Sequence, residues 1–369
     1  MNSTFKYRLY PKRSQATALN KQLDACRWVY NHFLEMRKKS WEDEQQGLGR
    51  YDQTGTLPEL KKEHEFLNDA YSQCLQNVAV RVDLSFRAFF RRVKAGDKPG
   101  YPRFRGKFRY DSFTYPQYGG FKVRKNGIHL GKIGTVKARL HRPIEGDPKT
   151  CTVRRTPTGK WFVTIVCNVE HTPAEQPDES AIGIDMGLEN FATLSSSETI
   201  ANPRFFRKEQ AALTKAQRKL SAQKKRTKAR EKARRVVARV HERIANKRHD
   251  FIHQQSRKLV NRFNTVVVED LSVNDMKKDN FRCINKSIGD AAWRMFLSAI
   301  DYKAECAGGR MVTVNPAYTS QTCSGCGTRQ KLKLSDRQYH CQCCGLSLSR
   351  DHNAALNILA LGVQGLAAA

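Results

Sequence analysis

Apolar residues recur at helical spacing in two long stretches near the start of the chain. A short strand-like run over 4–10 ends at Pro11, and a helical pattern follows, for which we expect Ser14 to be the N-cap. Its apolar positions recur three and four residues apart, at Leu19, Leu23, Cys26, Val29, Tyr30 and Phe33. A second helix is predicted over about 67–94. We interpret both apolar stripes as core positions.

The pattern changes from helical to extended after Gly96. Residues 99–109 mix Pro, Gly, aromatic and basic side chains, so no helix is predicted there. Strands are predicted over 121–124, 128–130, 152–154 and 161–169, separated by turn-forming residues. Short strands at this spacing predict a small β-barrel over 1–171, with a helical insertion at about 12–96. The Pro-containing stretch 172–180 is interpreted as a linker to a second domain.

Strands and helices alternate in the second domain, 181–369. Strands are predicted over 182–185, 191–194, near 199–200, over 265–269 and over 310–314. Helical periodicity covers about 206–263, 293–304 and 351–361. The predicted fold class is therefore α/β plus a β-barrel.

The composition predicts the kind of partner that this protein binds. The chain has 369 residues, 66 Lys and Arg against 35 Asp and Glu, and a net charge of +31. A compact body with this charge repels itself unless a polyanion neutralises it, so we expect a nucleic acid. A ribosome-associated protein and a membrane-surface binder remain alternatives. No apolar run is long enough to span a bilayer, and residues 1–6 do not resemble a signal peptide, so we expect a cytoplasmic protein.

Four of the eleven cysteines form two Cys-x-x-Cys pairs, Cys323 with Cys326 and Cys341 with Cys344. Four thiolates at this spacing can surround one structural Zn²⁺ ion, and the reduced cysteines of a cytosolic chain favour metal over disulfides. A glycine follows the second cysteine of each pair, which favours Cys344 over Cys343 as the fourth ligand. We therefore predict a zinc ribbon at about 318–347.

Three acidic residues lie where a two-metal phosphodiesterase site needs carboxylates. Asp185 and Glu269 end buried-type strands, and Asp351 begins the last helix. Taken singly, Asp351 is an ordinary helix N-cap and Asp185 a turn residue. Together with the order of strands and helices, they match an RNase H-like core with two catalytic Mg²⁺ ions. Asp270 competes with Glu269, and strand alternation alone does not decide between them.

These residues carry a resemblance to the TnpB family of transposon-encoded proteins, which are related to type V CRISPR effectors. In the second half the similar segments are 182–187, 267–271, 318–327, 341–345 and 350–358, and in the first half 7–11, 27–31, 75–77 and 100–104. The resemblance implies an RNA-guided DNA endonuclease with a RuvC-like nuclease domain, whose metal ligands are Asp185, Glu269 and Asp351. It also implies a wedge-type barrel with a helical recognition insert.

The resemblance further implies the partners. They are a guide RNA from the transposon end and double-stranded target DNA, bound by a protein that we expect to be a monomer in its RNA complex. Gln76 and Asn77 match the place where such proteins contact a short transposon-adjacent motif. We expect Arg103, Arg105 and Lys107, and the 17 Lys and Arg against 3 Glu between Arg207 and Arg248, to contact phosphates.

Three other interpretations remain open. A nuclease-inactive RNA-guided repressor of the same lineage is disfavoured because all three acids are present. A transposase with an RNase H-like core is not excluded by the acids but would not need an RNA. A zinc-ribbon nucleic-acid binder without chemistry explains the charge and the cysteines but not the three placed acids.

Overall fold

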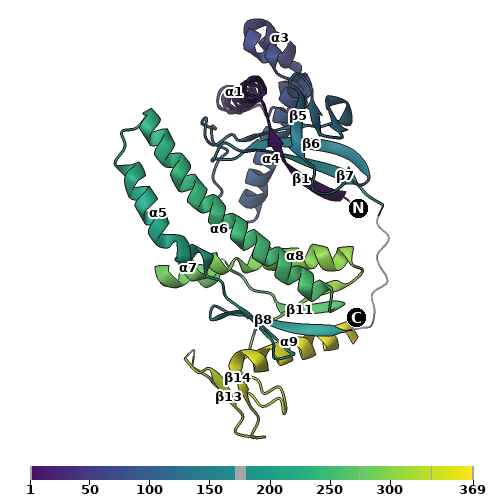
Figure 1. The fold of residues 1–369 in the computed structure, drawn as a ribbon, viewed down its shortest axis with the longest axis vertical. Helices are drawn as coiled ribbons and strands as arrows, with labels where there is room; N and C mark the ends of the chain where they lie inside the picture. Colours follow the sequence, from purple (N-terminus) through teal and green to yellow (C-terminus); the bar gives the residue numbers. More distant parts are fainter. Residues whose placement is uncertain (1, 171–179, 274, 279, 334, 368–369) are drawn as a thin grey trace. The chain divides into compact units, whose positions relative to one another are not determined.

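The chain divides into two compact units, residues 1–170 and 171–369 (Figure 1). The structure, a computed structural model, describes residues 2–170, 180–273, 275–278, 280–333 and 335–367. The linker predicted over 172–180 lies outside the described residues except for Ser180. In the described ranges, no helix is both long enough and apolar enough to cross a membrane.

The first unit is built on a seven-stranded antiparallel sheet. Its strands are β1 (Asn2–Tyr10), β2 (Ser112–Tyr115), β3 (Phe121–Arg124), β4 (Gly127–Leu130), β5 (Gly134–Arg139), β6 (Asp147–Arg155) and β7 (Trp161–Asn168), in the order β2-β6-β7-β1-β5-β4-β3. Alternate residues of β7 are buried, as expected for a sheet with one face on a core. No ladder joins β2 to β3 within the described residues, so the predicted barrel is an open half-barrel.

Helices inserted between β1 and β2 pack with this sheet in one core. They are α1 (Arg13–Glu44), α2 (Arg50–Gly55), α3 (Leu57–Glu63) and α4 (Ser72–Lys94). The N-cap of α1 is Lys12, not Ser14 as predicted, because the Gln15 side chain accepts a 3.0 Å hydrogen bond from the Lys12 amide. A short 3₁₀ turn over Glu65–Asp69 precedes α4, so the second predicted helix begins later than expected.

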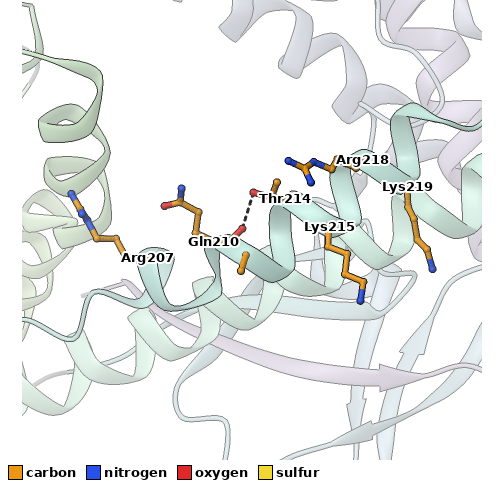
Figure 2. Close-up of a pocket in the computed structure, with 7 residues that line it drawn as sticks. Arg207, Gln210, Thr214, Lys215, Arg218 and Lys219 are labelled. Carbon is orange, nitrogen blue, oxygen red and sulfur yellow. Dashed lines mark hydrogen bonds between the residues drawn. The ribbon is translucent and has the colours of Figure 1, made fainter.

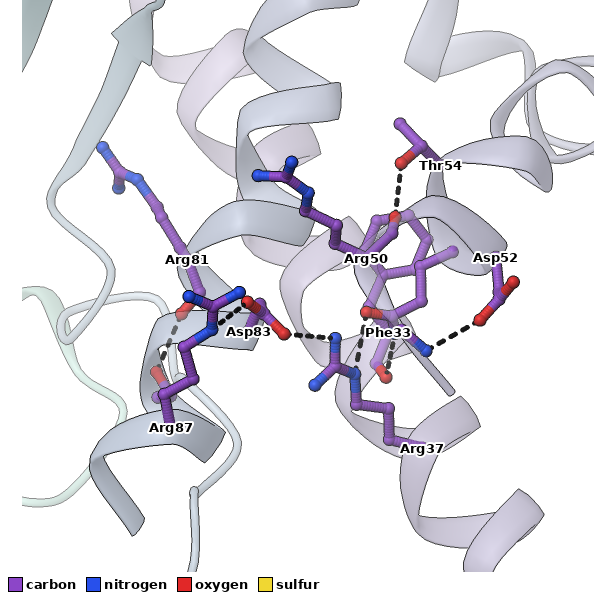
Figure 3. A network of polar contacts seen from close by, with 11 residues as sticks. Phe33, Arg37, Arg50, Asp52, Thr54, Arg81, Asp83 and Arg87 are labelled. Carbon is purple, nitrogen blue, oxygen red and sulfur yellow. Dashed lines mark hydrogen bonds and ion pairs between the residues drawn. The ribbon is translucent and has the colours of Figure 1, made fainter. Parts of the chain in front are cut away.

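A buried arginine ties three of these helices together (Figure 3). Arg37 of α1 is 8% exposed and donates to Gln53 of α2 at 3.1 Å and to Asp83 of α4 at 3.3 Å. Gln53 in turn donates to the carbonyl oxygen of Phe33 at 2.6 Å. A buried charge is tolerated only when it is paired and hydrogen-bonded, so this network fixes α4 against α1.

The second unit is built on a mixed five-stranded sheet. Its strands are β8 (Ala181–Met186), β9 (Asn190–Leu194), β10 (Thr199–Ala201), β11 (Thr265–Glu269) and β12 (Arg310–Val314), in the order β10-β9-β8-β11-β12. The strands β8, β11 and β12 run parallel, and Val268 of β11 is in register with Ile184 of β8. All five strands predicted from the sequence are present.

Helices cover both faces of this sheet (Figure 1). One face packs against α6 (Lys228–Val260) and α8 (Trp293–Cys306), and the other against α9 (Arg350–Ala367). The strand β11 is buried along its whole length because side chains on both of its faces are covered. The single helix predicted over 206–263 is in fact two, α5 (Phe205–Ser221) and α6, and the helix α7 (Arg282–Ala291) was not predicted.

Candidate functional site

Two glycine contacts dock α9 onto the sheet. A β-carbon on Gly183 would lie 2.2 Å from the carbonyl oxygen of Ala355, and one on Gly362 would lie 2.4 Å from Val267. Asp185 shares a strand face with Gly183 because side chains alternate along a strand. Asp351 precedes Ala355 by about one helical turn. The close packing of β8 on α9 therefore brings Asp185 and Asp351 to the same end of the sheet.

The same packing decides between Glu269 and Asp270. Val267 contacts α9, whereas Val266 and Val268 lie in the core on the opposite face. By alternation, Glu269 points to the α9 face with Val267. Glu269 is 7% exposed and Asp270 is exposed, with its amide bonded to the carbonyl oxygen of Val314. Glu269 thus joins Asp185 and Asp351, and Asp270 does not.

Two of the carboxylates, Glu269 and Asp351, act electrostatically on the third, Asp185. Burial, followed by the negative charges of Glu269 and Asp351, raises the pKa of Asp185 to about 8. Burial also raises the pKa of Glu269, while a hydrogen bond from Thr319 opposes that shift. A buried carboxyl group whose ionisation is penalised by two neighbouring acidic residues forms a site in which a cation is favoured, and oxygen ligands suit Mg²⁺. The three carboxylates are less tightly gathered than the cysteines described next.

Four cysteines form the group of metal-type ligands that lies closest together in the described residues. The sulfur atoms of Cys323, Cys326, Cys341 and Cys344 all lie within 4.8 Å of one another. Cys323 and Cys344 are 3.6 Å apart, and Cys326 and Cys341 are 3.5 Å apart. Four thiolates around one Zn²⁺ ion at the usual bond length are about 3.8 Å apart, so this group can hold a metal ion.

Local backbone geometry forms the two cysteine turns. Gly327 and Gly345 have φ angles of 76° and 73°, in the region that favours glycine, as predicted. Their amides donate to the carbonyl oxygens of Cys323 and Cys341. Hydrogen bonding with the side chain and the backbone of Thr328 lowers the pKa of Cys326 to about 6, which favours the thiolate. The exposed Cys343 lies outside the group.

A polar clamp, which the sequence did not reveal, joins the cysteine turns to the acidic residues. We use this name for the side chains of Thr319, Asn353 and Asn357. The Thr319 hydroxyl donates to Oε1 of Glu269 at 2.6 Å. Asn353 and Asn357 of α9 both donate to the carbonyl oxygen of Thr322 at 2.7 Å. The available signal was a pair of asparagines about one helical turn apart, at positions 353 and 357, shortly after Asp351.

The predicted nucleic-acid contacts of the first unit lie in two places. Gln76 and Asn77 are on α4, where Gln76 is exposed. Arg103, Arg105 and Lys107 are exposed in the irregular segment between α4 and β2. The amide of Arg105 donates to the Asn31 side chain at 2.7 Å, which holds this segment to α1. Within the described residues, no hydrogen bond joins the α4 pair, Gln76 and Asn77, to the three cations of the irregular segment.

An open groove along α5 presents further positive charge (Figure 2). It is lined by Arg207, Lys215, Arg218 and Lys219 together with Gln210, Ala211 and Thr214. On the neighbouring helix, Arg243 and Lys247 are partly neutralised by Glu209, at 3.0 and 3.2 Å. The cationic surface predicted from the sequence thus gathers on the α5–α6 pair, which suits a phosphate backbone.

Comparison with protein families matches three stretches of the chain. The model described as "Probable transposase" (OrfB of IS605) matches residues 164–280, and "Cas12f1-like, TNB domain" matches 293–358. A "Helix-turn-helix domain" of the OrfB group matches 1–46. In this structure residues 2–46 contain the strand β1 and the single helix α1, rather than two helices.

Relatives align over nearly the whole chain. A "Putative RNA-guided DNA endonuclease" of Streptomyces pristinaespiralis is 38% identical, covering 97% of this chain and 89% of its own length. The "Putative RNA-guided DNA endonuclease InsQ" of Escherichia coli (strain K12) is 32% identical, covering 97% and 92%. Among solved structures, the mini-RNA-guided endonuclease CRISPR-Cas_phi3 has a TM-score of 0.49 at 11% identity, covering 98% and 92%.

These relationships define the chain first as a protein of the insertion-sequence OrfB group. Within that group it belongs to the TnpB family. The resemblance noted in the sequence is thereby confirmed.

Proposed function

We propose that this protein is an RNA-guided DNA endonuclease whose cutting site is formed by Asp185, Glu269 and Asp351. The observation that carries the proposal is the convergence of these three carboxylates, from β8, β11 and α9, at one end of the sheet. Glu269 faces α9 while Asp270 does not. The names of the two long-aligning relatives support the same activity.

The three carboxylates have the chemistry to hold two Mg²⁺ ions, because hard cations prefer oxygen ligands. Bound there, the ions would supply Lewis-acid activation of water and stabilise the leaving oxygen of a phosphodiester. The residues themselves hold the ligand oxygens in place from rigid elements, since small misplacements are costly to catalysis. This organisation favours an RNase H-like, RuvC-type interpretation of residues 181–369.

The four cysteines fit one structural Zn²⁺ ion. Thiolate ligands at tetrahedral spacing favour zinc, and four protein ligands leave no open position for substrate. We therefore assign the cysteine group, in a ribbon over about 318–347 that includes β13 (Gln338–His340) and β14 (Ser347–Ser349), a structural role.

Sequence recognition is delegated to base pairing with the guide RNA, while the protein contacts phosphates and a short adjacent DNA motif. The exposed cations of the α5 groove and Arg103, Arg105 and Lys107 suit the phosphate contacts. Gln76, exposed on α4, suits a base-edge contact. In this scheme residues 1–171 form a wedge-type half-barrel with its recognition insert.

A second candidate follows from the family description "Probable transposase". A carboxylate triad on an RNase H-like fold also serves strand transfer, so the acids alone do not separate the two functions. A requirement for RNA does separate the two functions, because strand transfer needs no guide RNA.

The test is to express the chain with its native flanking DNA, purify it and sequence the RNA that co-purifies. We expect a discrete RNA with a variable 3′ segment, and Mg²⁺-dependent cutting of DNA complementary to that segment. Asp185→Ala should abolish cutting and retain guided binding. Purification without a discrete RNA would favour the transposase, and Mg²⁺-dependent cutting by Asp185→Ala would refute the assignment of the triad.

A further inference from the structure

The side chain of Glu269 has one hydrogen-bond partner among the described residues. That partner is the hydroxyl of Thr319, which is 5% exposed and lies 2.6 Å from Oε1. The hydroxyl also lies 3.2 Å from the carbonyl oxygen of Pro316. A hydroxyl has a single proton to donate, and the shorter contact to a carboxylate is the stronger of the two. Thr319 therefore orients the Glu269 carboxylate.

The backbone around Thr319 is itself fixed by α9. Asn357 donates to the carbonyl oxygens of Thr319 and Thr322, at 2.8 and 2.7 Å. Asn353, which is fully buried, donates to Thr322 and accepts from the amide of Ser324 at 2.9 Å. Ser324 lies between Cys323 and Cys326. One face of α9 is thus hydrogen-bonded to the first cysteine turn and to the residues before it.

The same helix carries Asp351 in its first turn. Asp351 and Asn353 are two positions apart, and Asn357 follows Asn353 by one turn. Hydrogen bonds therefore link the segment that carries the first cysteine turn to Glu269 through Thr319, and to α9 through the asparagines. All of these contacts lie in the second unit.

We propose that Thr319 is a positioning residue for the nuclease site: its hydroxyl orients Glu269, and Asn357 of α9 holds its backbone in place. The inference rests on the function proposed above. The ribbon is then a support for Glu269 in addition to any surface it presents. A hydrogen-bond partner that orients a metal ligand typically contributes about 10–100-fold to metal affinity or activity.

The test uses the full chain assembled with its guide RNA and a matched DNA target. The cleavage rate is measured against Mg²⁺ concentration for the wild type, Thr319→Val and Thr319→Ser. Thr319→Val keeps the shape of the side chain but loses the donor, so the half-saturating Mg²⁺ concentration should rise by about 10–100-fold. Thr319→Ser retains the hydroxyl and should stay close to the wild type.

The neighbouring Thr322 provides a matched control. Its hydroxyl donates to the carbonyl oxygen of Tyr318 at 3.0 Å and does not reach an acidic residue. Thr322→Val removes a hydroxyl from the same segment and should leave the Mg²⁺ dependence unchanged. Zinc content and guided DNA binding, measured on every variant, should match the wild type.

Each result has a defined meaning. An unchanged Mg²⁺ dependence in Thr319→Val overturns the inference, as does a loss of zinc in that variant or a failure of Thr319→Ser to restore the wild-type response. If the wild-type complex itself does not cut the matched target, the proposed function fails instead, and the two failures are thereby distinguished.

Discussion

Gly183 of β8 lies directly against Ala355 of α9, so close that a β-carbon at position 183 would stand 2.2 Å from the Ala355 carbonyl oxygen. The clash is with backbone, which cannot rotate away as a side chain can. Together with the contact of Gly362 on Val267, this contact determines how closely the strand that carries Asp185 lies to α9, which carries Asp351 in its first turn.

The first prediction is that Gly183→Ala lowers the free energy of unfolding by about 1–3 kcal/mol, because overpacking forces α9 away from the sheet. Cleavage should fall with it, since the carboxylates would separate. Urea denaturation checks the stability. Gly365→Ala is the control: this exposed glycine of α9 has open space around it, and alanine there should stabilise the helix by about 0.5–1 kcal/mol.

A second prediction compares two adjacent acids. Glu269→Gln should lower the cleavage rate roughly 100-fold or more, because a site that contributes several kcal/mol to the transition state loses a charged ligand. Asp270→Asn removes the same charge from the exposed neighbour and should cut at close to the wild-type rate. Single-turnover cleavage of a guide-matched DNA measures both. Equal losses in the two variants would contradict the assignment of Glu269.

A third prediction separates Cys344 from Cys343. Cys344→Ser removes one of four clustered sulfurs, so the purified protein should lose most of its bound zinc and become less stable. Cys343→Ser should keep one zinc per chain, because Cys343 is exposed and outside the cluster. Atomic emission on the purified proteins counts the metal. Zinc loss in Cys343→Ser with retention in Cys344→Ser would reverse the choice of ligand.

A fourth prediction concerns a buried lysine. Lys303 of α8 is 4% exposed and donates to the carbonyl oxygen of His253 and the hydroxyl of Ser256, at 2.8 and 2.7 Å. Burial, then the charge of Arg257, lowers the pKa of Lys303 to about 8. The ordinary pKa of lysine is about 10.4, so between these values the unfolded chain binds more protons than the folded one.

The contribution of Lys303 to stability should therefore rise as the pH increases from about 8 to about 10.4, and be constant below that window. Urea denaturation of the wild type and Lys303→Met across this range isolates the effect as a difference. Lys258→Met on α6 serves as the control, because Lys258 is exposed. A difference between wild type and Lys303→Met that does not change with pH would contradict the prediction.

Much of the second unit was predictable because its strands β8 and β11 are apolar runs with a carboxylate at or next to their last residue. The break between α5 and α6 was not predictable. The intervening residues contain no Gly or Pro, and the turn depends on Arg226 adopting a φ of 66°, which non-glycine residues seldom do. The strand β5 was missed because only Val136 and Ala138 of its six residues are buried.

Some residues of the site were likewise predictable from the sequence, and others were not. The cysteine pairs were found from spacing alone, since their ligands are close in sequence. Periodicity did not choose between Glu269 and Asp270; the family resemblance implied Glu269, and the position of α9 agrees with that choice because Val267 of the same strand face packs on α9. Thr319 was missed because its contact with Glu269 spans 50 residues and exists only after packing.

The docking of α9 on β8 also determines when the site comes into existence. Asp185 and Asp351 are 166 positions apart, so the packing of β8 on α9 that brings them together is of high sequence separation, and its loop-closure entropy must be overcome in folding. During synthesis, the half-barrel and the cationic helix pair α5–α6 leave the ribosome before α9 does. The set of carboxylates that we propose for cleavage is thus complete only after α9 has been synthesised and has docked on β8.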